Sequence, residues 1–171
     1  MRENEVILVD DNDQPIGTME KMEAHEKALL HRAISVFITN SKGEWLLQQR
    51  TFDKYHSKGL WTNTCCSHPF PDETPHEAAD RRLMEEMGLK TRLKEVFSFK
   101  YIQKLENNLT EHEFDHVFTG VSDQEPQPHP DEVMSYKYVD YSQIKHDLEL
   151  HPENYTAWFK LIFERVGSLI H

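Results

Sequence analysis

The sequence predicts one domain of the α+β class, in which a mixed β-sheet lies between helices and an N-terminal strand extension precedes the main sheet. Its 171 residues suit a single domain and are enough to bury a core. Hydrophobic residues make up 37% of the chain and aromatic residues 11%, which argues against disorder. Strand and helix patterns intermix without a regular βαβ repeat, which favours a mixed sheet over a doubly wound one.

The first half of the chain is rich in short strand patterns. Alternating and β-branched runs predict strands at 5–9, just after the turn DDNDQPIG, at 33–40 and, across an SKGE hairpin turn, at 45–50. The segment MEAHEKALLH, residues 22–31, is ambiguous between a short helix and a loop. Residues 51–59 are expected to form a polar loop rich in Lys and His, and LWTNTCC, residues 60–66, is expected to form a strand.

The clearest helix pattern follows the proline-broken loop SHPFPDE. Thr74 can serve as N-cap, Pro75 fits the first helical position and Glu77 fits the capping box. The helix is expected to run through HEAADRRLMEEM and to end at Gly88, because glycine is common just after a helix. Beyond it the sequence predicts three strands, at 91–104, 111–120 and 135–140. Two helices follow, at 141–149 and 153–169.

The composition is strongly acidic, with nineteen basic and thirty acidic residues and a formal net charge of −11. Such a chain repels nucleic acid and anionic membrane surfaces, so neither is an expected partner. No apolar run approaches the roughly 18 residues needed to span a bilayer, and no secretory signal is visible at the N-terminus. The adjacent Cys65 and Cys66 cannot make a disulfide framework, so the expected location is a reducing cytoplasm.

Residues 67–89 carry a spaced pattern of Glu, Arg and Gly that resembles the Nudix box, G-x5-E-x7-R-E-U-x-E-E-x-G-U, where U is aliphatic. The matching residues are Glu73, Arg81, Leu83, Glu85, Glu86, Gly88 and Leu89. Such a helix presents carboxylates one turn apart to a hard cation that bridges diphosphate oxygens. On an isolated acidic helix the glutamates would indicate only a solvated face, but the flanking residues in register favour the motif.

Two positions depart from the box: Ser67 replaces its first glycine and Arg82 replaces a glutamate. In Nudix hydrolases that glutamate helps to hold the metals that activate water. Arginine cannot coordinate a cation, but its planar guanidinium suits a phosphate. The box is therefore expected to bind an intact diphosphate rather than to hydrolyse one.

A second set of residues narrows the resemblance. TNTCCSHP places Cys66 two residues before His68, and EHE places Glu111 and Glu113 on one face of a strand. With the altered Nudix box, these motifs resemble the type I isopentenyl-diphosphate isomerases, Nudix-superfamily enzymes of isoprenoid synthesis. The resemblance covers nearly the whole chain. It implies a single Nudix-like isomerase domain over 1–171, with a Nudix core at 30–162 and the box at 67–89.

The resemblance implies two metal sites and a diphosphate clamp. A tightly bound divalent ion (Mn, Zn or Mg) would take a set of N and O ligands from His25, His31, His68, Glu111 and Glu113. A second ion, Mg²⁺, would bridge the diphosphate to Glu86 and to the backbone carbonyl of Cys66. The residues implied to clamp the diphosphate are Lys21, Arg50, Lys54 and Arg82.

It also implies that Cys66 and Glu113 are the catalytic pair. Converting isopentenyl to dimethylallyl diphosphate requires a proton added to an alkene carbon and another removed from the allylic carbon, which two acid–base groups on opposite faces can provide. Trp158 would stabilise the tertiary carbocation through its indole face, and Tyr101 would assist proton transfer. Core packing of the last helix explains Trp158 equally well.

Two other functions stay open at this level. A Nudix hydrolase of a nucleoside or prenyl diphosphate would share the fold, but Arg82 speaks against it. A non-enzymatic metal-binding module would explain the histidines but leaves Cys66, Arg50 and Arg82 unexplained. The expected partner is a small-molecule prenyl diphosphate, and the expected state is a monomer or weak dimer.

Overall fold

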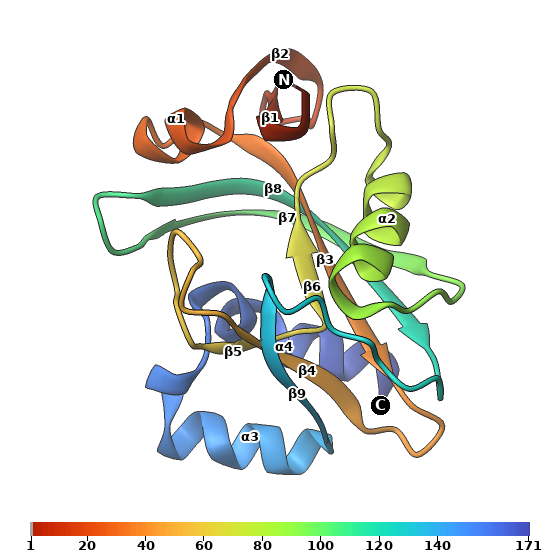
Figure 1. The fold of residues 1–171 in the computed structure, drawn as a ribbon. Helices are drawn as coiled ribbons and strands as arrows, with labels where there is room; N and C mark the ends of the chain where they lie inside the picture. The colour runs from red at the N-terminus through yellow and green to blue at the C-terminus, as the bar shows by residue number, and fades with distance from the viewer. Residues whose placement is uncertain (1) are drawn as a thin grey trace.

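The computed structural model describes residues 2–171, apart from the side chain of Arg2, and in this range it contains a nine-stranded mixed sheet with helices on both faces (Figure 1). The strands are β1 Glu5–Val9, β2 Pro15–Glu20, β3 His31–Thr39, β4 Trp45–Arg50, β5 Trp61–Thr62, β6 Cys65–Ser67, β7 Lys94–Lys104, β8 Thr110–Val121 and β9 Val133–Val139. The α-helices are α1 Lys21–Glu26, α2 Pro75–Met87, α3 Tyr141–Leu150 and α4 Ala157–Ile170, and the 3-10 turns are η1 Arg2–Asn4 and η2 Pro152–Asn154.

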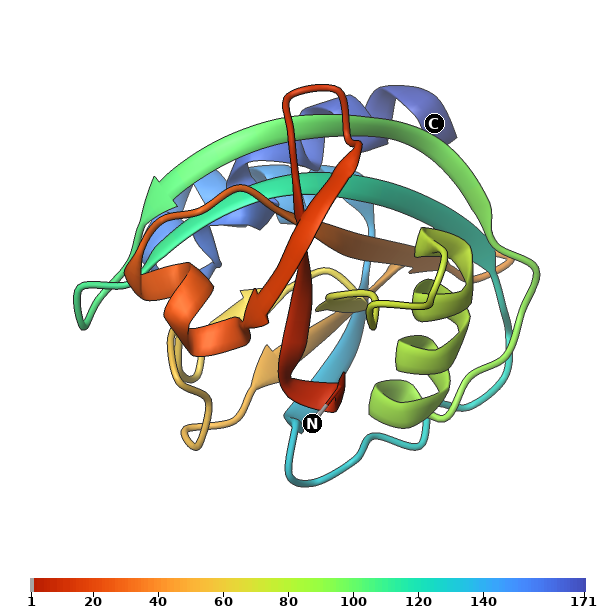
Figure 2. The same cartoon turned by 90° about the horizontal axis from the view of Figure 1, so that it is seen from above.

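The strand registers bring distant parts of the chain together. Strands β3 and β8 pair in parallel with His31 opposite Glu113, and β7 pairs antiparallel with β8, with Tyr101 opposite the same Glu113. Strand β6 pairs antiparallel with β3 and places Cys66 opposite Ser35. In Figure 2, β7 and β8 arch together over the molecule. The paired strands β3 and β8 therefore hold, side by side, residues that are 82 positions apart in the chain.

Side chains on the two faces of the sheet form two cores. One face packs against α2 through Ile34, Val36, Ile38, Phe118, Ala78, Ala79, Leu83 and Met87. The other face packs against α3 and α4 through Phe37, Trp45, Leu47, Val117, Ile144, Phe159, Ile162, Phe163 and Val166. The alternation along β3 follows the two-residue period of a strand. This sandwich, with the β1–β2 hairpin added next to β3, confirms the predicted fold class.

Helix α2 begins and ends as the sequence predicts. The Thr74 side chain accepts a hydrogen bond from the backbone N–H of Glu77, whose carboxylate bonds back to the Thr74 backbone. Pro75 is the first helical residue, and Gly88 ends the helix in the left-handed conformation, with φ 64°. A side chain at Gly88 would meet the backbone of Gln127, so the site needs glycine for space as well as for conformation.

The prediction of one strand over residues 60–66 is wrong: the segment forms two short strands, β5 and β6, which pair with β4 and β3 respectively. Asn63 and Thr64 interrupt the pairing because their side chains bond to the backbones of both neighbouring strands. The Asn63 amide donates to Val36 O at 3.0 Å, and the Thr64 hydroxyl donates to Leu46 O at 2.7 Å. Side-chain bonds to the backbone thus replace the strand ladder here.

The C-terminal prediction is also partly wrong. The expected helix over 153–169 is a 3-10 turn, η2, followed by α4, because Tyr155 is extended and buried and Thr156 caps the new helix through the Phe159 N–H. The ambiguous segment 22–31 resolves into α1 and the start of β3. None of the helices between residues 2 and 171 has both the length and the apolar character needed to cross a membrane.

Candidate active site

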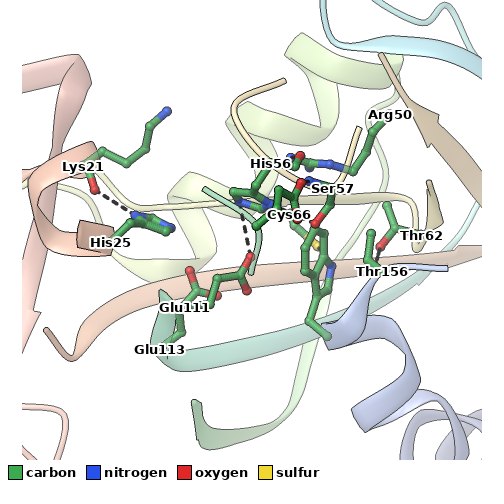
Figure 3. Close-up of polar contacts among 12 residues, drawn as sticks. Lys21, His25, Arg50, His56, Ser57, Thr62, Cys66, Glu111, Glu113 and Thr156 are labelled. Carbon is green, nitrogen blue, oxygen red and sulfur yellow. Dashed lines mark hydrogen bonds and ion pairs between the residues drawn. The ribbon is translucent and has the colours of Figure 1, made fainter. Parts of the chain in front are cut away.

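A cavity of about 400 Å³ lies where β1, β3, β6, β7, β8 and the helices α1, α2 and α4 approach one another. Figure 3 shows the carboxylates of Glu111 and Glu113 pointing from β8 toward the imidazoles, while Lys21 extends away from them. Ten of the residues expected in the site line this cavity: Lys21, Arg50, Lys54, Cys66, His68, Arg82, Tyr101, Glu111, Glu113 and Trp158. Three further expected residues, His25, His31 and Glu86, are almost wholly buried.

Three imidazoles and one carboxylate converge in the part of the chain that the structure describes. The ligand atoms of His25, His31, His68 and Glu113 all lie within 4.8 Å of one another. The Nδ1 atom of His25 lies 2.8 Å from Lys21 O, and that of His31 lies 2.8 Å from Leu29 O. Because a carbonyl oxygen can only accept, each Nδ1 carries the proton and each Nε2 is left as the atom that can bind a metal.

These four residues fit a divalent cation. The Nε2 atom of His25 is buried and has no hydrogen-bond partner among the described residues. Burial lowers the pKa of His25, and burial lowers the pKa of His68 to about 4 despite the nearby carboxylate of Glu113, so both rings are neutral at pH 7, as metal ligands must be. Nitrogen and carboxylate ligands of this kind suit Zn²⁺ or Mn²⁺.

The two glutamates of β8 share a face but differ in their surroundings. Burial opposes ionisation of Glu113, but the neighbouring rings of His31 and His68, whose Nε2 atoms lie 3.2 and 2.8 Å from its Oε2, hold its pKa well below the usual range. Burial raises the pKa of Glu111, and the charge of Glu113 adds to that rise. The Tyr101 hydroxyl bonds to both carboxylates. Glu111 lies beside the four-residue cluster rather than within it, and its role as a metal ligand stays a prediction.

His56 is a site residue that sequence reasoning missed, because 51–59 looked like an ordinary polar loop. It is 3% exposed, with Nε2 3.3 Å from a Glu111 oxygen and Nδ1 3.0 Å from the Ser57 hydroxyl. Burial and the charge of Arg50 lower the pKa of His56 to about 2, so the ring stays neutral. No spacing in the sequence separates this histidine from a solvated one. Only its nearness in the sequence to Arg50 and Lys54, two expected site residues, could have indicated it.

The two adjacent cysteines face opposite sides, as expected of neighbours in a strand. Cys65 is fully buried in the core against α2, whereas Cys66 lines the cavity. The Cys66 thiol donates to Asn63 Oδ1 at 3.2 Å and accepts from Trp158 Nε1 at 3.0 Å. Burial, followed by the charge of Asp115, raises the pKa of Cys66. The thiol is thus protonated, oriented and in contact with the cavity.

Trp158 is both packed and part of the cavity wall. It is 3% exposed, and the Arg50 guanidinium lies 5.1 Å from the centre of its ring. The His56 ring meets it edge-on at 5.7 Å. The indole ring therefore already contacts one cation, Arg50, and an aromatic face of this kind can stabilise positive charge. Trp158 thus packs in the core and also lines the cavity.

Five cationic side chains line the same cavity, although the chain as a whole is acidic: Lys21, Arg50, Lys54, Arg81 and Arg82. Lys54 Nζ lies 2.6 Å from a Glu132 oxygen, and Arg82 Nη2 lies 2.8 Å from the same oxygen. Burial lowers the pKa of Lys21, and the charges of Lys54 and Arg82 lower it further. Lys21, Lys54 and Arg82 line one cavity, and cations gathered in this way suit an anion with several oxygens.

The Nudix-like box divides into a structural part and a part directed at the cavity. Arg81 binds Glu73 through two hydrogen bonds of 2.7 and 2.8 Å and stacks on Phe70, so it braces the loop before α2. Glu86 is buried with one carboxylate oxygen lacking a partner among the described residues. Burial raises the pKa of Glu86 to about 7. A buried carboxylate beside the cavity fits a hard cation such as Mg²⁺.

Comparisons with known proteins identify related sequences over most of the chain. The NUDIX domain family model matches residues 29–159. The chain is 55% identical over 162 residues to the isopentenyl-diphosphate Delta-isomerase of Pectobacterium atrosepticum, covering 95% of this chain and 90% of that protein. It is 47% identical to the enzyme of that name from Serratia proteamaculans, covering 95% and 91%.

Solved structures support the same fold. The crystal structure of DR0079 from Deinococcus radiodurans superposes with a TM-score of 0.75 at 17% identity, covering 94% of this chain and 97% of that one. A MutT protein from Methanosarcina mazei superposes with a TM-score of 0.66 at 23% identity, covering 81% and 94%. At these identities the likeness establishes the architecture alone.

Proposed function

Because this chain belongs to the isopentenyl-diphosphate Delta-isomerases within the NUDIX domain family, we propose that its cavity converts isopentenyl diphosphate to dimethylallyl diphosphate. One observation carries the proposal: a single cavity is lined by an oriented thiol, Cys66, and by a hydrogen-bonded carboxylate–phenol pair, Glu113 and Tyr101. Two acid–base groups in one cavity are what a double-bond shift requires.

In the proposed reaction one of these groups adds a proton to the terminal alkene carbon and the other removes a proton from the allylic carbon. No atom is gained or lost and nothing is oxidised. The hydrogen bonds to Asn63 and Trp158 hold the Cys66 thiol in place, and Tyr101 links Glu113 to Glu111 for proton movement. The indole face of Trp158 would stabilise the tertiary carbocation between the two steps.

We assign the first metal site to His25, His31, His68 and Glu113, with Glu111 as a further ligand, and the Mg²⁺ site to Glu86 and the Cys66 carbonyl. When bound, the two ions supply positive charge, one beside the carboxylates of β8 and one to the diphosphate. Lys21, Arg50, Lys54 and Arg82 would hold the diphosphate. We further propose that the chain forms one isomerase domain that is a monomer or a weak dimer. It would act on a small prenyl diphosphate in the cytoplasm.

The test of this function is an assay with isopentenyl diphosphate and Mg²⁺, followed by separate measurement of acid-labile allylic product and released phosphate. The isomerase proposal expects the allylic product without phosphate. Phosphate release without allylic product would instead identify a Nudix hydrolase, and neither product would leave only a metal-binding role.

The metal site predicts that the purified protein carries about one tightly bound divalent ion per chain. Replacing His68 with alanine is expected to remove that ion, because one of three imidazole ligands is lost. Elemental analysis of the wild type and of His68→Ala measures this directly. His146→Ala, an exposed histidine on α3, is the matched control. A fully active wild type without metal would contradict the site.

The diphosphate clamp predicts that Arg82→Glu raises the KM for isopentenyl diphosphate about 10- to 100-fold, because a charged donor becomes a repelling carboxylate. Arg92→Glu changes the net charge equally at an exposed position and should leave KM unchanged. Steady-state kinetics of both variants tests this. An unaltered KM in Arg82→Glu would remove Arg82 from the binding residues. Arg82→Glu also restores the glutamate that the Nudix box has at this position, but this change need not create a hydrolase.

A further inference from the structure

Glu132 lies in the loop just before β9 and lines the cavity. A single oxygen of its carboxylate, Oε2, accepts from both Lys54 Nζ at 2.6 Å and Arg82 Nη2 at 2.8 Å. The three side chains are only 17%, 28% and 15% exposed, for Lys54, Glu132 and Arg82 respectively. This carboxylate oxygen accepts hydrogen bonds from two charged donors. A phosphate oxygen bound at the same place would accept from the same two donors.

The charge of Glu132 is secured by its neighbours. Two charged donors, Lys54 and Arg82, contact one oxygen of its carboxylate, and this favours the ionised form. Lys21, a further cation, lines the same cavity. Without a negative group between them, Lys54 and Arg82 would stand close together in a site that water reaches poorly.

One of the hydrogen-bond donors of the Arg82 guanidinium lacks an acceptor among the described residues. Its Nη1 donates to Glu85 at 2.6 Å and its Nη2 donates to Glu132, but its Nε is buried and has no partner among the described residues. A buried donor without an acceptor is costly, so an incoming anion gains by satisfying it. An anion with several oxygens could bond Nε and also take over Nη2 and the Lys54 ammonium, which requires Glu132 to leave.

We propose that Glu132 is a resident counter-anion that holds Lys54 and Arg82 when no other anion is bound there and is displaced from both by the diphosphate of the substrate. The inference rests on the proposed function, because it takes these cations as the diphosphate site. Glu132 then sets the affinity of the site: it competes with the diphosphate for two cations, and it reclaims them as the product leaves. It positions these cations and touches no reacting carbon.

Calorimetric titration with inorganic pyrophosphate and Mg²⁺ tests the proposal on the metal-loaded enzyme. Glu132→Gln is expected to bind pyrophosphate about 5- to 20-fold more tightly than the wild type, because the competing carboxylate is gone while its length is kept. Glu164→Gln removes the same charge from an exposed position of α4 and should bind like the wild type. The KM for isopentenyl diphosphate should fall in Glu132→Gln and stay unchanged in the control.

Equal or weaker pyrophosphate binding by Glu132→Gln would overturn the proposal, since a carboxylate that only organises the cations gives that result. Failure of the wild type to bind pyrophosphate would overturn the proposed diphosphate site itself, and this inference with it. A crystal structure of the wild type with Mg²⁺ and pyrophosphate gives an independent test should Glu132→Gln not fold. Lys54 and Arg82 are then expected to contact pyrophosphate oxygens and to have lost Glu132, and retention of both Glu132 contacts would overturn the proposal.

Discussion

Replacing Cys66 with alanine is expected to reduce isomerisation by at least ~10²- to 10⁴-fold, the usual contribution of a general acid–base group. The thiol lines the cavity and is fixed by Asn63 and Trp158, so the variant loses the proton carrier on that wall. Fold and metal content should be intact, because no atom of the Cys66 side chain belongs to the imidazole–carboxylate cluster. Turnover, thermal midpoint and bound metal are measured together.

Cys65→Ala is the matched control, because it makes the same chemical change one residue earlier. Cys65 is fully buried against α2 and away from the cavity lining. Its loss leaves a small void, so the thermal midpoint should fall while most activity is kept. An inactive Cys65→Ala together with an active Cys66→Ala would reverse the assignment of the two side chains.

Helix α2 shows what could be predicted from the sequence. Its start and end depend on local chemistry, the Thr74–Glu77 capping box and Gly88, so nearby residues were enough to place both. The period of two residues likewise placed Glu111 and Glu113 on one face of β8. The resemblance then supplied the set of residues, and the structure gathers most of them at one cavity.

The error at 60–66 and the two omitted residues have a different origin, because they depend on partners far away in the chain. The strand predicted at 60–66 divides because Asn63 and Thr64 bond to strands β3 and β4, which no local pattern reveals. His56 becomes a site residue only because its loop folds over β8, where its Nε2 atom lies 3.3 Å from a Glu111 oxygen. Glu132 is defined by Lys54 and Arg82, which are 78 and 50 residues away.

Replacing Glu113 with glutamine is expected to lower turnover by ~10²- to 10⁴-fold and to release much of the tightly bound metal. Glu113 is the carboxylate of the proposed metal-binding cluster; one of its oxygens lies 2.8 Å from His68 Nε2, and it also contacts Tyr101. Glutamine keeps the size of the side chain but removes the charge, so it can neither accept a proton from carbon nor balance a divalent ion. Turnover and elemental analysis of the same preparation measure both losses.

Glu111→Gln is the informative comparison, because it makes the same change two residues earlier on the same face of β8. Glu111 bonds to Tyr101 and His56 rather than to the imidazole cluster, and burial already raises the pKa of its carboxyl group. A neutral amide therefore resembles the form that burial favours, and Glu111→Gln should keep more metal and more activity than Glu113→Gln. The opposite order, with Glu111→Gln inactive and Glu113→Gln active, would move the catalytic carboxylate to Glu111 and make Tyr101 and His56, rather than the three imidazoles, its working partners.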